Sequence, residues 1–205
     1  MTVFVALLRG INVSGQKRIR MAELQKSCEA LGLTDVRSYL QSGNLVFRAS
    51  QADPRKLAAA LRARIAEDFG HDVGVLVFPA KELNRVAGSN PLWRQSEGDE
   101  TLFHATFLFQ SVSAARFRHL KLPAQPGEQA VLVGRVVFLY CPHGYGRTKL
   151  NNSYFEKALG VPATTRNWRT VLALQDLCTK PWTSCASRRP AGARSHESTH
   201  HRPLR

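Results

Sequence analysis

The sequence predicts an α+β protein whose first 79 residues form a ferredoxin-like β-α-β-β-α-β unit. Three observations lead to this fold class. An unbroken apolar run spans residues 2–8, which is typical of a central strand buried on both faces. Two amphipathic segments lie at residues 21–31 and 54–69. Between them, residues 35–40 and 45–47 have the composition of two short strands joined by a tight turn.

Capping residues define the two helices. The first places its apolar residues, Cys28 included, along one stripe, and Gly32 ends it. Asp53-Pro54 opens the second with an N-cap aspartate and a proline at the first helical position, and Gly70 ends it. Residues 73–78 then supply the fourth strand. We therefore expect Cys28 to lie in the core.

A related pattern recurs in residues 80–177 and predicts a second, smaller α+β subdomain. A short helical segment and a polar loop lead into it. The expected elements are a strand at 101–109, a helix at 113–120, a hairpin of strands 129–133 and 135–140, and a helix at 150–159. A last helix, capped by a threonine, is expected from Arg166 to about Leu177, with Trp168 packing it onto the body. We find no sequence repeat strong enough to indicate duplication.

Composition and charge narrow the class of protein. Residues 178–205 are rich in Pro, Ser, Arg and His without apolar periodicity, which predicts a disordered basic tail. The net charge is +14, and residues 1–177 alone hold 23 basic and 14 acidic residues. Such an excess of positive charge favours binding of polyanions or phosphorylated ligands. We expect a cytoplasmic protein with no membrane span, four reduced cysteines, no metal and no cofactor, because the corresponding segments and spacings are absent.

One sheet edge collects polar side chains. In the predicted topology the ends of the first two strands meet the start of the third, so the loop 9–12 and the turn 41–44 should be neighbours. This set contains Arg9, Asn12, Lys17, Tyr39, Gln41, Ser42 and Asn44. A glycine-containing loop that feeds a helix N-terminus favours an anion. Alternatively, Asn12 and Asn44 take left-handed conformations and the polar groups bond one another, pinning the loop to the hairpin.

Two later segments add cations at expected helix starts. Residues 143–149, ending in Lys149, precede one helix, and residues 164–169, with Arg166 and Asn167, open the other. Neither has the spacing of a P-loop or of a dinucleotide-binding fingerprint. Cys141 and His143 are the only nucleophile and base close in sequence, and a cysteine at a strand end is more often a small hydrophobe than a nucleophile.

Four segments in order carry a family resemblance. They are Leu-Arg-Gly-Ile-Asn-Val at 8–13, Met-Ala-Glu-Leu at 21–24, Tyr-Leu-Gln-Ser-Gly-Asn-Leu-Val-Phe at 39–47, and Ala-Thr-Thr-Arg-Asn-Trp at 163–168. The chain resembles the bacterial DUF1697 family, named for having no assigned function, over residues 1 to about 177. The resemblance implies two α+β subdomains, the first ferredoxin-like, and supplies no catalytic residues. The tail and Arg20, where the family often has proline, depart from it.

The sequence thus predicts a protein that binds an anionic ligand at the edge formed by the loop 9–12 and the turn 41–44, aided by Lys149, Arg166 and Asn167. Nucleic acid is the leading candidate partner and a phosphorylated small molecule the other. One alternative is an enzyme that acts on a phosphorylated metabolite at the same edge. A second is that these polar residues are purely structural. The oligomeric state stays open.

Overall fold

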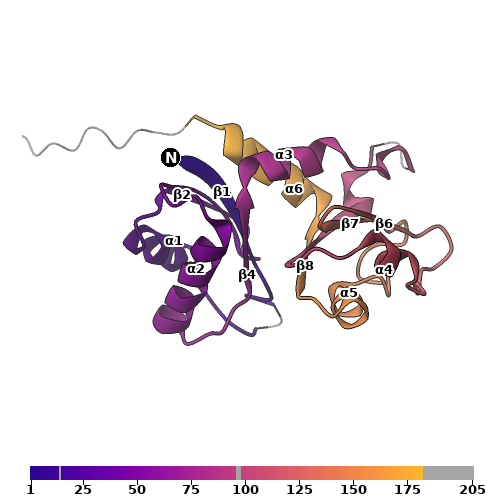
Figure 1. Ribbon diagram of the computed structural model, residues 1–205, viewed down its shortest axis with the longest axis horizontal. Coiled ribbons are helices and arrows are strands. Elements are labelled where there is room, and N and C mark those ends of the chain that lie inside the picture. The colour runs from indigo at the N-terminus through magenta and orange to yellow at the C-terminus, as the bar shows by residue number, and fades with distance from the viewer. Residues whose placement is uncertain (14, 96–97, 182–205) are drawn as a thin grey trace, which may run out of the picture.

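The computed structural model describes residues 1–13, 15–95 and 98–181. These residues form two four-stranded antiparallel sheets, six α-helices and two short 3₁₀ turns (Figure 1). The prediction of a mixed α+β protein is therefore confirmed.

The first sheet has the strand order β2-β3-β1-β4. Its strands are β1 (Thr2–Leu8), β2 (Thr34–Tyr39), β3 (Asn44–Ala49) and β4 (Val75–Pro79), and its helices are α1 (Met21–Ala30) and α2 (Pro54–Phe69). Both helices pack on one face of this sheet, and Cys28 is buried there as expected. The Asp53 carboxylate caps α2 by accepting from Arg55 N, and Gly70 ends the helix at φ +67°.

The second sheet has the order β6-β7-β5-β8, which repeats the order of the first with every number raised by four. Its strands are β5 (Phe103–Leu108), β6 (Gln129–Val133), β7 (Val136–Tyr140) and β8 (Ala163–Asn167), and its helices are α4 (Ala114–Arg118) and α5 (Asn152–Leu159). Residues of α4 and α5 join the buried cluster on its outer face. The structural echo of the first half is thus more complete than the sequence pattern indicates.

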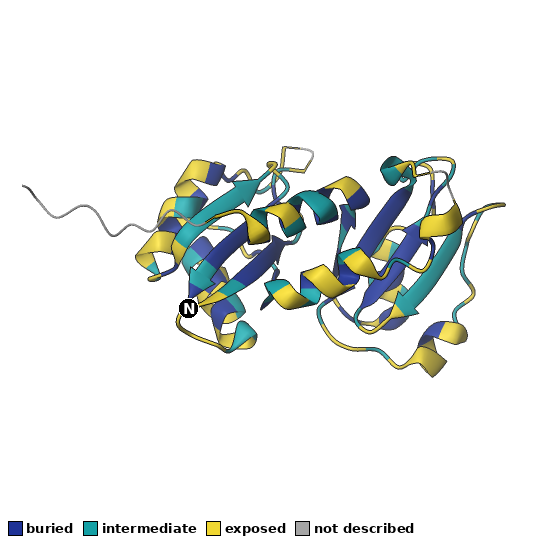
Figure 2. Cartoon of the chain, turned by 90° about the horizontal axis from the view of Figure 1, so that it is seen from above, coloured by how far each residue is buried: buried dark blue, intermediate teal, exposed yellow. Residues whose placement is uncertain are grey.

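A shared core joins the two halves. The inner faces of both sheets contribute to one apolar cluster, in which the Phe78 and Phe107 rings stack at 5.6 Å. Two further helices, α3 (Ala80–Gly88) and α6 (Trp168–Thr179), close this cluster. Seen from above, both cross between the sheets, whose strands are mostly buried (Figure 2). Trp168 is 2% exposed, which confirms its expected packing role.

The start of the last helix was predicted wrongly. Residues 163–167 form strand β8, and α6 begins only at Trp168. The β-branched pair Thr164 and Thr165 suits a strand, and both residues pair with β5. The helix cap is Asn167, whose side-chain oxygen accepts from Arg169 N at 3.0 Å. Arg166 therefore lies in a strand and not at the start of a helix.

Candidate functional site

The loop 9–12 and the turn after β2 lie side by side, as the topology predicted. Leu8 N donates to Gly43 O at 2.8 Å, and the side-chain amide of Asn12 donates to Gln41 O at 2.7 Å. The fit at Gly43 is tight, because a Cβ there would lie 2.6 Å from the Cβ of Leu8. Asn12 takes the expected left-handed conformation at φ +53°, whereas Asn44 lies in β3 and does not.

Arg166 fastens this edge to the second half of the chain. Its guanidinium points from β8 into the first sheet, and the residue is 7% exposed. It donates to Asn44 Oδ1, to Thr164 Oγ1 at 2.7 Å, and to the carbonyl oxygens of Leu8 (2.7 Å), Thr165 (2.9 Å), Ser42 (3.2 Å) and Gly43 (3.4 Å). All these partners are neutral. Burial lowers its pKa to about 10, so the group stays charged at neutral pH.

Asn44 completes this joint from the other side. It is fully buried, and its amide nitrogen donates to Tyr39 O at 2.8 Å and to Ser42 Oγ at 3.0 Å while its oxygen accepts from Arg166. Asn12 similarly binds both backbone groups of Ile19. For Asn12, Asn44 and Arg166 the geometry is that of the structural alternative, in which polar groups bond one another across a loop joint.

Three other predicted residues lie apart from one another. Tyr39 is partly buried against the shared core. Asn167 is the neighbour of Arg166 in β8, so it faces the opposite side of the sheet, where its amide contacts Thr101 O. Lys149 is exposed in the loop before α5. None of the three lies in the pocket that contains Arg9 and Lys17.

The cysteine–histidine pair does not form. Cys141 is buried, and burial raises the pKa of its thiol to about 12. His143 instead contacts the carbonyl oxygen of Pro126 at 3.0 Å. Cys141 is thus a small core residue, as the sequence favoured.

Arg9 reaches across the boundary between the halves in a bidentate ion pair. Its Nε lies 2.6 Å from Glu156 Oε1, and its Nη2 lies 2.5 Å from Oε2. Glu156 also accepts from Ala163 N at 2.8 Å. Burial alone would raise the pKa of Glu156, but the hydrogen bonds from Arg9 and Ala163 lower it overall, so this carboxylate is ionised at neutral pH.

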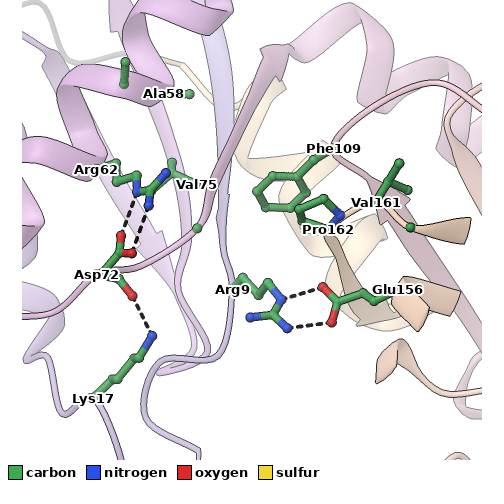
Figure 3. A pocket seen from close by; sticks show the side chains of 13 residues that line it. Arg9, Lys17, Ala58, Arg62, Asp72, Val75, Phe109, Glu156, Val161 and Pro162 are labelled. Atoms are coloured by element: carbon green, nitrogen blue, oxygen red, sulfur yellow. Dashed lines mark hydrogen bonds and ion pairs between the residues drawn. The ribbon is translucent and has the colours of Figure 1, made fainter. Parts of the chain in front are cut away.

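This ion pair forms one wall of a pocket of about 660 Å³ between the halves (Figure 3). On the opposite wall Arg62 makes its own bidentate pair with Asp72, at 2.7 and 2.9 Å. Lys17 Nζ lies 2.5 Å from the backbone oxygen of Asp72. The apolar side of the pocket is lined by Ala58, Ala59, Val75, Phe109, Val161 and Pro162.

Sequence reasoning missed three of these charged residues. Arg62 lies on α2 and Asp72 in the loop before β4, ten residues later in the same half, whereas Glu156 lies on α5 of the second half and meets Arg9 only when the halves pack. Each sits singly on a surface, without motif spacing. The predicted residues Asn12 and Gln41 instead line a separate hollow of about 610 Å³ beside the start of α1, together with Arg18 and Arg20.

In the described ranges no three His, Cys, Asp or Glu side chains gather as metal ligands would. Of the helices described, none has the length and apolar character that crossing a membrane requires.

Three comparisons with known proteins bear on identity. A search of curated proteins found no match. Among solved structures, the conserved bacterial protein SP0830 from Streptococcus pneumoniae is similar in fold, with a TM-score of 0.65 and 24% sequence identity over 86% of this chain and 98% of that one. The family model described as "Protein of unknown function (DUF1697)" matches residues 1–138. This match covers most of the chain and confirms the resemblance read from the sequence, so the protein belongs to the DUF1697 family.

Proposed function

We propose that this protein binds a small anionic molecule, a phosphate ester in class, in the pocket between its two halves. The observation that carries the proposal is that Arg9, Lys17 and Arg62 converge on one space from separate elements. The same pocket holds two carboxylates, Asp72 and Glu156, so its lining carries three positive and two negative charges. A seam between packed units is a common place for small-molecule sites, and this volume lies in their usual range of about 300–1,000 Å³.

The ion pairs leave donors for such a ligand. Arg9 and Arg62 each use Nε and Nη2 on a carboxylate, while Nη1 of each has no hydrogen bond to any residue in the described part of the chain. In Figure 3 the remaining nitrogen of Arg9 points away from Glu156, toward the side where Asp72 and Lys17 lie. The carboxylates hold both guanidiniums in place, so a phosphate meets positioned donors instead of freely rotating side chains.

A thermal-shift titration tests the proposal. Inorganic phosphate, phosphoserine and a sugar phosphate are added at constant ionic strength, with chloride as the reference anion. A ligand at about 100 times its Kd stabilises the folded state by about 2.7 kcal/mol, which is readily seen as a rise in Tm. Lys17→Gln and Arg62→Gln should each weaken binding about tenfold or more, because each removes a charge-assisted hydrogen bond.

The matched control is Lys149→Gln, which removes an exposed lysine outside the pocket. It should leave the affinity unchanged. The proposal is wrong if no phosphate compound raises Tm above the chloride reference, or if Lys149→Gln weakens binding as much as Lys17→Gln does.

A nucleic acid is the second candidate, favoured by the hollow beside α1. There Arg18 and Arg20 flank Asn12 and Gln41, and within the described residues Arg18 forms no ion pair. A nucleic-acid complex that is held by phosphate contacts must weaken steeply as the salt concentration rises. Titration of a labelled single-stranded RNA at salt concentrations of about 50–300 mM therefore separates nucleic-acid binding from the pocket proposal. Affinity independent of salt would exclude it.

For the architecture we infer a ferredoxin-like arrangement of residues 1–79 and a related subdomain over 80–177. The element order β1-α1-β2-β3-α2-β4 and the strand order β2-β3-β1-β4 support the first assignment, and the matching order of the second sheet supports the other. The remaining boundary, at 178, falls inside α6, and residues 182–205 lie outside the described part of the chain.

A further inference from the structure

Strand β4 has an unpaired backbone edge. Among the strands of the described residues it pairs only with β1. Arg9 N donates to Gly74 O at 2.8 Å, and this bond shows which residues of β4 form the hydrogen-bonded pairs with β1. Because hydrogen-bonded pairs alternate along such a ladder, Leu76 and Phe78 bond to β1. The N–H and C=O groups of Val75 and Val77 therefore point away from the sheet. Within the described residues they have no hydrogen-bond partner.

At the corresponding edge of the second sheet, side chains bond outward-facing backbone groups. Strand β8 occupies the position in its sheet that β4 has in the first. There, Ala163 N donates to the Glu156 carboxylate at 2.8 Å, and Thr165 O accepts from Arg166 Nη1 at 2.9 Å. Side chains thus satisfy outward backbone groups of β8, whereas those of β4 are left open.

A groove runs along the open edge of β4. The pocket of Arg9 and Lys17 adjoins a second hollow of about 780 Å³, and the two share Ala58, Val75 and Phe109. All five residues of β4 line this second hollow, with the start of α2 on one side and residues 109–111 on the other. Val75 and Val77 are only 7% and 4% exposed, so their backbone groups sit in a recess. Unpaired backbone groups in a recess are costly, and a partner that bonds them is stabilising.

We propose that the open edge of β4 takes up an extended peptide as a fifth strand of the first sheet, with an acidic residue at the end nearest Arg9, Lys17 and Arg62. A segment of about five residues spans the edge, since β4 is five residues long and a strand rises about 3.3 Å per residue. The placement of the acidic end rests on the proposed function. The pairing with β4 does not depend on it.

Two other occupants fit the groove less well. The described chain ends beside β2, where Arg37 binds Pro181 O at 2.7 Å, and β2 is the opposite edge of the sheet from β4. The following residues, 182–205, carry five arginines and one glutamate, which a pocket with excess positive charge repels. A second copy of the chain would need to bring its own β4 into contact, but two recessed edges cannot approach each other closely enough to pair.

A random twelve-residue peptide library displayed on phage, selected against the whole protein, tests the proposal. We expect the recovered sequences to contain a run of β-branched and aromatic residues followed or preceded by aspartate or glutamate. Ala58→Trp fills the groove from α2 and should reduce binding of a synthetic copy of a recovered peptide by more than about tenfold. Ala60→Trp is the matched control, because Ala60 is exposed on the same helix and lines neither hollow.

Amide hydrogen exchange on the unaltered protein gives a second, direct readout. In saturating peptide, exchange at Val75 and Val77 should slow about tenfold or more, while that at Leu76, already bonded to β1, should change little. Acidic selection that persists unchanged in Lys17→Gln, or no acidic preference in the peptides that the unaltered protein selects, with Val77 still protected, would refute the acidic end alone. Recovery of peptides that leave Val75 and Val77 unprotected, binding indifferent to Ala58→Trp, or protection of these amides by single-stranded RNA instead would overturn the proposal.

Discussion

His104 makes the stability of this protein dependent on pH. It lies on β5, is 6% exposed, and its ring stacks on Tyr145 with the ring centres 4.4 Å apart. Asn167 Oδ1 accepts from Arg169 N, so the amide nitrogen of Asn167 is the atom that faces His104 Nε2, at 3.3 Å. Nε2 therefore accepts, the proton lies on Nδ1, and Nδ1 is buried without a partner in the described structure.

The magnitude follows from the two pKa values. Burial lowers the pKa of His104 from 6.5 to about 4, so the folded state resists the proton that the unfolded state accepts. The stability that this neutral histidine contributes is complete above pH 6.5 and is lost as the pH falls toward 4. Proton linkage gives a loss of about 2 kcal/mol between pH 7.5 and pH 5, and about 3 kcal/mol once both states are protonated.

Urea unfolding at pH 7.5, 6, 5 and 4.5 measures this loss. His104→Gln removes the titrating ring and should flatten the dependence between pH 7.5 and 5, even if the variant is less stable throughout. His143→Gln is the control, because it makes the same replacement at an exposed histidine outside the core. An unaltered pH dependence in His104→Gln would refute this account of the buried ring.

Three further predictions concern the joint between the halves. Arg166→Lys should lower the free energy of unfolding by about 3 kcal/mol or more, because one ammonium cannot bond the six oxygens that the guanidinium contacts. Denaturant titration measures this loss. A loss below about 1 kcal/mol would contradict the role of Arg166 in fastening the two halves. Gly43→Ala should lower the free energy of unfolding by about 2 kcal/mol or more in the same assay, because Gly43 has φ +76° and an added Cβ would clash with Leu8. Gly98→Ala is the control and should cost less, because Gly98 has φ +95° but open space around it. Glu156→Gln should cost about 1 kcal/mol, and a double-mutant cycle with Arg9→Gln should show coupling between the two side chains; additive losses would mean that the ion pair is inert.

The elements that the sequence predicted well have local causes. The two helices of the first sheet follow from apolar periodicity and from caps within one turn, such as Asp53 and Gly70. The adjacency of the loop 9–12 and the turn 41–44 follows from chain order once the topology is known. Both inferences use interactions between residues close in sequence or between neighbouring strands.

The elements that were missed depend on distant pairing. The segment at residues 163–167 resembles a helix start when read alone. It becomes a strand because it pairs with β5, in which Thr106, 59 residues earlier, lies opposite Thr165. Arg166 was expected to meet a ligand, but its partners are backbone oxygens of β1 and of the hairpin turn. The contact between Arg9 and Glu156 cannot be predicted from the spacing of residues in the sequence, because it forms only when the two halves pack.

Helix α6 is the last described helix of the chain, yet it packs on β1, β2 and β3, which are made first. During synthesis, the part of the first sheet's inner face that α6 covers therefore lacks this cover until α6 has left the ribosome. Val5, Leu7 and Val46 belong to that face. Contacts this far apart in sequence also slow folding, since long loops must close first. A nascent chain that is stopped before α6 would expose an apolar β-sheet surface, and we expect chaperones to bind this surface.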